Sequence, residues 1–146
     1  MAAATKVTIQ KYVERDSYLN WFASYHAAAN ALDNSGAQPV FALPVKGLRR
    51  IAVHLTVGGN ALAAFQIRGY LGDADTSPIL LKSTTADYTT GLKGVLIDCS
   101  GDLSTLAVGG GWFVLDVSGF DTIELWANSS VAGGSTLALD AGGSTF

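Results

Sequence analysis

The segment WFVLDVSGFDTIELWAN (residues 112–128) decides the fold class, because two strongly apolar runs flank its central Ser118-Gly119. Every second residue is apolar in both runs: Phe113, Leu115 and Val117 in the first, and Ile123, Leu125 and Ala127 in the second. This alternation is typical of β-strands that bury one face. We therefore expect two core strands, joined either by a tight hairpin or by a corner between two packed sheets that tucks Phe120 inward.

Similar short runs occur along the rest of the chain. Strands are expected over 5–13, 40–43, 50–57, 62–71, 79–82, 95–99 and 137–140, and 103–108 forms either a strand or the covering side of a loop. Gly58-Gly59-Asn60 lies between two of these runs and predicts a hairpin turn. The pentapeptide AGGST occurs at 132–136 and 141–145, and both copies are interpreted as turns around the last short strand.

Residues 14–39 are the least regular part of the sequence, and we interpret them as an irregular arm or a short helix. They gather the aromatic residues Tyr18, Trp21, Phe22 and Tyr25 ahead of an alanine-rich piece. That piece fits either a short helix over 23–32, ended by Asn34-Ser35-Gly36, or an extended arm. The aromatic side chains are expected either to plug one end of the fold or to anchor to a neighbouring chain.

About eight short strands with at most one short helix predict an all-β fold. Their regular spacing favours one antiparallel β-sandwich domain over 1–146, jelly-roll-like, with an up-and-down barrel as the alternative. A chain of 146 residues has the usual size of a single domain.

The composition indicates assembly with other chains. Hydrophobic residues make up 49% of the sequence and charged residues only 14%, against about 25% in an average soluble domain. No apolar run approaches the ~18–20 residues that span a bilayer, so no membrane partner is expected. We therefore expect other subunits to cover the apolar surplus.

The charge distribution argues against a nucleic-acid partner, because a net charge of −3 provides no positive field for phosphates. The one dense basic stretch holds Lys46, Arg49 and Arg50 just before an expected strand. We interpret it as a solvated or salt-bridged patch, with a phosphate site as the alternative. The start MAAATKVTIQ lacks the long apolar core of a signal peptide, so folding in a cytoplasm is expected.

The motifs predict neither catalysis nor a cofactor. The only cysteine, Cys99, has apolar neighbours and is interpreted as a small buried thiol. His26 and His54 have no second ligand at metal-binding spacing, and His54 is expected on the outward face of its strand. Asp73 and Asp75 are interpreted as part of a polar turn, with a calcium site as the alternative. Serine-hydrolase and phosphate-loop motifs are absent, so a non-enzymatic protein is expected.

The tryptophans raise the hypothesis of sugar binding, because aromatic faces can stack on pyranose rings. Trp126 is the first candidate and Trp112 the second. Packing of Trp126 against a second sheet, an arm or another subunit is the favoured interpretation in so apolar a chain. The sugar hypothesis predicts an exposed tryptophan beside polar hydrogen-bonding groups.

The stretch WFVLDVSGFDTIELWANSSVAGGSTLAL resembles segments of small virion proteins of tailed bacteriophages, above all the auxiliary capsid proteins called decoration or cement proteins. The resemblance implies a β-rich domain on the outer capsid surface, made in the host cytoplasm and assembled as dimers or trimers. It implies a non-enzymatic function, in which the protein stabilises the shell by bridging neighbouring major capsid subunits. A glycan-binding or fibre domain and a tail or head-completion protein are the alternatives.

Composition selects the residues that we expect at protein interfaces under this interpretation. They are Tyr18, Trp21, Phe22, Tyr25, Lys46, Arg49, Arg50, Trp126 and Phe146.

Overall fold

The computed structural model describes residues 7–15, 21–36, 38–71, 78–82, 95–100, 106–131 and 133–145. These residues form strands β1 to β11 and no helix, and therefore no helix that could cross a membrane. The strands are β1 (Val7–Thr8), β2 (Tyr12–Arg15), β3 (Trp21–Ala31), β4 (Gln38–Pro44), β5 (Arg50–Gly59), β6 (Leu62–Tyr70), β7 (Pro78–Lys82), β8 (Leu96–Cys99), β9 (Gly111–Asp116), β10 (Thr122–Ser129) and β11 (Ser135–Ser144).

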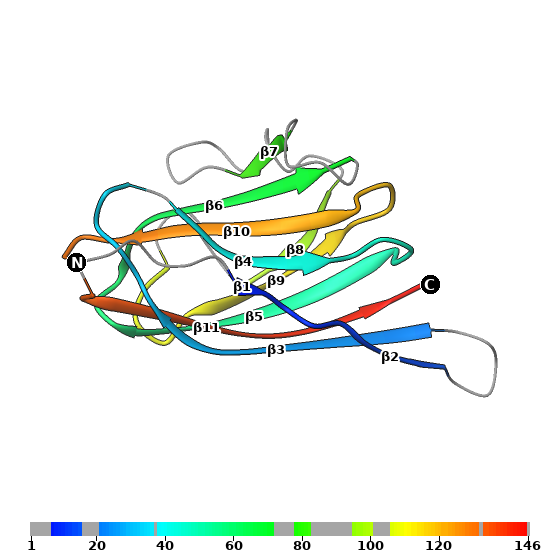
Figure 1. Ribbon diagram of the computed structural model, residues 1–146, viewed down its shortest axis with the longest axis horizontal. Coiled ribbons are helices and arrows are strands. Elements are labelled where there is room, and N and C mark those ends of the chain that lie inside the picture. Colours follow the sequence, from blue (N-terminus) through cyan, green and yellow to red (C-terminus); the bar gives the residue numbers. More distant parts are fainter. Residues whose placement is uncertain are drawn as a thin grey trace.

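The strands make two sheets that lie in separate layers (Figure 1). The smaller sheet has the order β1-β4-β10-β6-β7, and the larger sheet has the order β2-β3-β11-β5-β9-β8. The described pairs are antiparallel except for β1 with β4, which is parallel. The expected all-β fold is thus confirmed, with eleven strands in place of about eight.

One apolar core lies between the two sheets. Phe65 of the smaller sheet and Phe113 of the larger sheet are both fully buried, and their ring centroids are 6.2 Å apart. Burying a side chain of this size stabilises a fold by about 1.5–3 kcal/mol. The largest fully buried side chains come from both layers and are Phe41, Phe65, Phe113, Leu32, Leu43, Ile51, Leu55 and Ile67.

Of the two connections expected within 112–128, a tight hairpin or a corner, the corner is present. β9 belongs to the larger sheet and β10 to the smaller one, so the chain crosses between layers at Ser118-Gly119. Gly119 has a φ of +90°, which glycine adopts without strain. Phe120 packs closely over Gly69, where an added Cβ would lie 2.5 Å from the Phe120 ring. The corner interpretation is therefore confirmed and the tight hairpin is excluded.

The hairpin expected at Gly58-Gly59-Asn60 is wrong. β5 pairs with β9 and β11, whereas β6 pairs with β7 and β10, so this turn also carries the chain between sheets. Alternation predicts only that each strand buries one face, and a hairpin within one sheet and a crossing between two sheets both satisfy this pattern. Gly59 has a φ of +78°, and an added Cβ would lie 2.3 Å from the Gly134 carbonyl oxygen. Gly59 therefore allows the chain to cross between the sheets close to the backbone of Gly134.

The short helix expected over 23–32 is also wrong, and so is the irregular arm, because β3 spans most of this region. Ala23, Tyr25 and Ala27 are buried, whereas the intervening Ser24 and His26 are exposed. This period of two is a strand pattern. Pairing of β3 with both β2 and β11 therefore overrides the helix propensity of the alanines.

Two further expectations fail at the ends of the chain. The single strand expected over 5–13 is divided between β1 in the smaller sheet and β2 in the larger sheet, with Ile9 buried between them. The second AGGST copy lies inside β11 and is not a turn. An added Cβ at Gly143 would lie 2.8 Å from Leu48 Cδ1, so this glycine allows close packing within a strand.

Candidate functional site

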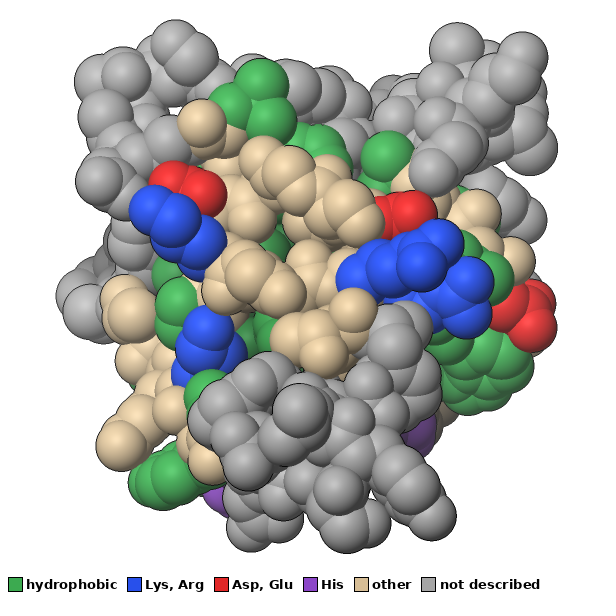
Figure 2. All heavy atoms as spheres, turned by 90° about the vertical axis from the view of Figure 1, so that its right-hand side faces the viewer, with side chains coloured by type: hydrophobic (Ala, Val, Ile, Leu, Met, Phe, Trp, Pro, Cys, Tyr) green, Lys and Arg blue, Asp and Glu red, His purple; other side chains and the backbone are tan. Residues whose placement is uncertain are grey.

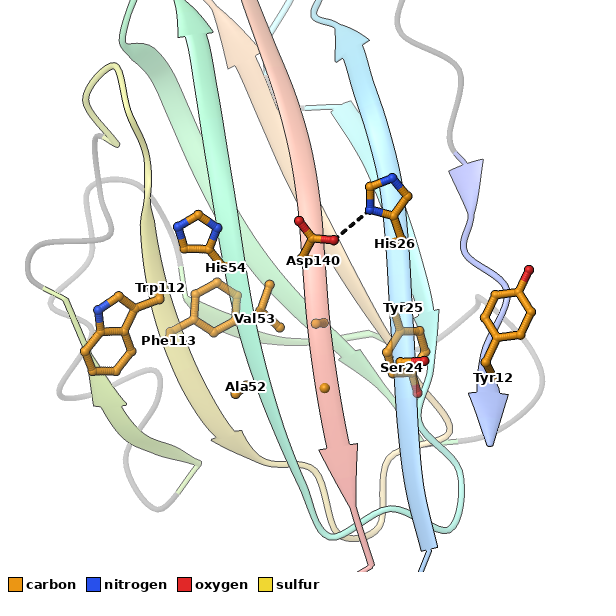
Figure 3. A pocket seen from close by; sticks show the side chains of 12 residues that line it. Tyr12, Ser24, Tyr25, His26, Ala52, Val53, His54, Trp112, Phe113 and Asp140 are labelled. Atoms are coloured by element: carbon orange, nitrogen blue, oxygen red, sulfur yellow. Dashed lines mark hydrogen bonds and ion pairs between the residues drawn. The ribbon is translucent and has the colours of Figure 1, made fainter. Parts of the chain in front are cut away.

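A groove of about 650 Å³ lies on the outer face of the larger sheet. Its lining residues come from β2, β3, β11, β5 and β9, which are neighbours in the sheet (Figure 3). The side chains on this face alternate with core residues, so the strands that build the core also position the groove.

A row of polar and aromatic side chains crosses one side of the groove. Strand pairing places His26 opposite Asp140, Asp140 opposite His54, and His54 opposite Trp112. His26 Nδ1 and Asp140 Oδ1 are 2.6 Å apart, with 74% of the His26 side chain and 69% of the Asp140 side chain exposed. Because both side chains are so exposed, their polar atoms are accessible to a ligand. Such an exposed pair contributes at most about 1 kcal/mol to stability.

The floor of the groove is made of small residues. Ser24, Gly142 and Ala52 are paired across β3, β11 and β5. Each lies two residues along its strand from a member of the polar row. An added Cβ at Gly142 would meet only the Ala23 carbonyl oxygen, at 3.9 Å, so packing does not demand glycine there. A second hollow of about 290 Å³ shares Ala52 and Gly142 and extends toward Phe22. The two hollows therefore adjoin at the groove floor.

Aromatic side chains stand at both ends of the groove. Trp112 on β9 is 40% exposed, and Tyr12 on β2 is 58% exposed (Figure 3). The Tyr12 hydroxyl donates to Gln10 Oε1 at 3.3 Å. Each ring therefore offers an apolar surface beside polar groups, a combination that occurs in small-molecule sites.

The His26–Asp140 pair resembles the base-orienting half of a hydrolytic triad, in which a carboxylate holds the imidazole. A working triad also needs a nucleophile bonded to the other ring nitrogen. The nearby hydroxyl, Ser24, lies two residues along β3, and no hydrogen bond joins it to His26 in the described part of the chain. The described arrangement thus provides binding groups without an assembled nucleophile.

The other outer face, on the smaller sheet, holds Trp126 in a hydrogen-bonded cluster. Trp126 Nε1 and the Tyr70 hydroxyl both donate to Glu124 Oε1, at 2.9 and 2.7 Å. The Arg68 guanidinium lies 3.7 Å from the centre of the Trp126 ring, and its nitrogens donate to Gln66 Oε1. Glu124 is only 1% exposed. Internal partners therefore occupy the indole N–H and one face of the ring.

The predicted basic patch lies at the end of the molecule that faces the viewer in Figure 2, where Lys and Arg side chains gather beside acidic ones. Lys46, Arg49 and Arg50 are exposed there. Hydrogen bonds from the Ser118 hydroxyl and backbone N–H lower the pKa of Asp116, and the charges of Arg49 and Arg50 lower it further. The patch is therefore partly compensated by an acidic neighbour, as a salt-bridge patch would be.

The aromatic residues expected at interfaces have different positions. Phe22 is exposed on the outer face of the larger sheet, whereas Tyr25 points into the core and its hydroxyl donates to the Pro44 carbonyl oxygen. Burial raises the pKa of Tyr25. Trp21 belongs to β3. Tyr18, Phe146, Asp73 and Asp75 lie outside the described residues.

The remaining residues with possible chemical roles, Cys99 and His54, form no further site among the described residues. Cys99 is half-buried in β8, and the described residues contain no group of three metal-ligating side chains. His54 is exposed, as expected from its strand pattern. The sequence did not single out Tyr12, Ser24 or Asp140 for the site. Outward alternation on each strand was the available signal, but it does not reveal which strands are neighbours.

Comparison with known proteins finds similarity at the level of structure. Neither a known protein family nor a curated protein matches the chain. Among solved structures, the chain is similar to the SPBc2 prophage-derived protein YomS, with 10% sequence identity and a TM-score of 0.48. The superposition covers 86% of this chain and 94% of that chain.

Proposed function

We propose that this protein is a non-catalytic carbohydrate-binding domain that stacks a sugar ring on Trp112. The observation that carries the proposal is the exposed Trp112 on β9, which is paired with His54 on β5, with Asp140 on the next strand, β11. A pyranose ring has an apolar face and hydroxyl groups that both donate and accept hydrogen bonds. A stacking surface beside a carboxylate and an imidazole therefore suits it.

The strand order supports the further proposal that the fold is a jelly roll. Strands β3 to β6, and again β9 to β11, alternate between the two sheets. The larger sheet contains the run β3-β11-β5-β9, and the smaller one contains β4-β10-β6-β7. Two sheets of four strands connected in this way correspond to a jelly roll, an architecture found in lectins and viral capsid proteins.

The test is binding to immobilised cello-, chito- and alginate oligosaccharides and to purified bacterial surface polysaccharides. We expect the intact chain to bind at least one of these glycans and Trp112→Ala to weaken that binding by about tenfold, the loss expected for one stacked ring. The variant should keep the fold, because the ring is exposed.

Ile97→Ala is the matched control, since Ile97 is an exposed apolar residue of the same sheet that does not line the groove. It should bind as the unmodified chain does. Failure of the unmodified chain to bind any of the glycans, or full binding by Trp112→Ala, would contradict the proposal.

A second candidate function is that of a virion structural protein, as the sequence resemblance implies. Exposed apolar side chains on edge strands favour it: Val7 on β1, Val13 on β2 and Ile97 on β8. Edge strands with such side chains are ready to pair with other chains. We propose that these edges assemble the chain into a dimer or trimer that bridges major capsid subunits on the outer capsid surface.

Light scattering and co-sedimentation with purified phage capsids test this second function. A stable oligomer that sediments with capsids and raises their resistance to heat would support it. A monomer that stays in the supernatant would exclude it. Glycan binding on Trp112 can hold in either case, because Trp112 lies on β9, which is not an edge strand.

A further inference from the structure

The floor of the groove continues as a trough that runs across the strands. Strand pairing places Tyr12, Ser24, Gly142, Ala52 and Val114 in one row over β2, β3, β11, β5 and β9. Neighbouring strands are about 4.8 Å apart, so the row extends over about 19 Å. The three central members have small side chains or none. The trough is therefore long and narrow.

Two rows of mostly larger side chains border the trough, one on each side. One border is the row of His26, Asp140, His54 and Trp112. The other is the row of Phe22, Ser144, Arg50 and Asp116, two residues away along the same strands in the opposite direction. Both borders thus combine an aromatic ring with hydrogen-bonding groups. A ligand lying in the trough would meet polar groups on both sides.

We infer that the ligand is a linear polysaccharide segment that lies along this trough, across the strands, with several sugar units bound at once. The inference rests on the proposed carbohydrate-binding function. Trp112 and Tyr12 stand four strands apart, at about 19 Å, so one sugar ring cannot contact both. An extended chain can, and the absence of a side chain at Gly142 keeps its path open at the middle of the floor.

A size series of oligosaccharides tests the inference. Cello-, chito- and alginate oligosaccharides from single sugars to long oligomers would be titrated into the intact chain by calorimetry. We expect the dissociation constant to fall by about a hundredfold with length, as successive units each add about one stacking or hydrogen-bonding contact, and then to level off.

Two variants separate the ends of the trough. Tyr12→Ala should weaken the longest oligomer about fivefold and leave the shortest binding oligomer unchanged, because only a long chain reaches Tyr12. Trp112→Ala should weaken both. A third variant, Gly142→Leu, should abolish long-oligomer binding by filling the floor. Ala138→Leu is its matched control, because it adds the same side chain on β11 beyond the polar row.

Gly142→Ala shows whether the loss in Gly142→Leu comes from the larger side chain or from misfolding. Its Cβ has room, so this variant should fold normally and its binding should fall only slightly. Single sugars that bind as tightly as long oligomers would overturn the inference while leaving the proposed function intact. The same holds for long-oligomer binding that is unaffected by both Tyr12→Ala and Gly142→Leu. If no oligomer in the series binds, the inference falls together with the proposed function.

Discussion

The outer faces of the two sheets differ in how their polar groups are used. On the smaller sheet, Glu124 accepts hydrogen bonds from Tyr70 and Trp126, and Arg68 covers one face of the Trp126 ring. On the larger sheet, the exposed Trp112 stands beside a polar row at the edge of a groove. A tryptophan in a strand can serve as a binding surface only where its neighbours leave it uncovered.

The largest expected effect concerns stability and distinguishes the two tryptophans. Trp126→Ala should lower the free energy of unfolding by about 3 kcal/mol, because it removes a half-buried ring, a hydrogen bond to a buried carboxylate and the contact with Arg68. Trp112→Ala should cost clearly less, about 1 kcal/mol, because Trp112 is 40% exposed. Urea denaturation measures both values. Equal losses would contradict the contrast between a covered face and an open one.

A smaller effect is expected from the two glycines of β11. Gly143→Ala should destabilise the protein by about 1–2 kcal/mol, since its Cβ would lie 2.8 Å from Leu48 Cδ1 and 3.1 Å from the Arg50 carbonyl oxygen. Gly142→Ala should stabilise it by about 0.5 kcal/mol, because alanine loses less backbone entropy on folding. Thermal melting of both variants gives the comparison. A stabilising Gly143→Ala would show that the larger sheet is less tightly packed than described.

The smallest effect is a pH dependence at the rim of the larger sheet. The pKa of Asp116 is lowered in the folded state, so its carboxylate contributes stability above the pKa of the unfolded chain. That contribution is lost as the pH falls through the folded-state pKa. Between about pH 6 and about pH 2, Asp116→Asn should therefore lose less stability than the unmodified chain.

Denaturation at several pH values measures this difference. Asp33→Asn is a useful companion, because the Ser35 hydroxyl lowers the pKa of Asp33 at a loop away from the groove. It should show the same sign. An unchanged acid sensitivity in Asp116→Asn would mean that Ser118, Arg49 and Arg50 do not stabilise the charged form of Asp116.

Much of the fold could be predicted from the sequence, because alternation reports the buried face of each strand. This pattern indicated β10 and the outward position of His54, whereas it left a hairpin and a corner near Phe120 as equal alternatives. It misled at β3, where alanine favours a helix in isolation but sheet pairing on both sides decides the structure. Turn glycines were likewise ambiguous, since Gly59 serves a crossing between sheets and not a hairpin.

The groove could not be predicted in the same way. Tyr12, His26, Asp140 and Trp112 lie far apart in the sequence and come together through the order and register of five strands. Register depends on nonlocal pairing, which local alternation does not specify. For Trp126 the sequence favoured packing over sugar binding, but it could not identify Arg68 and Glu124 as the residues that contact the ring.

The most direct test of the central claim is a titration followed by nuclear magnetic resonance of the tryptophan indole N–H groups. The probes are the cello-, chito- and alginate oligosaccharides, and Trp112→Phe and Trp126→Phe assign the two signals. The account predicts that a binding oligosaccharide shifts the Trp112 signal and leaves the Trp126 signal in place. A shift at Trp126 with Trp112 unchanged, or no shift at either with any probe, would contradict it.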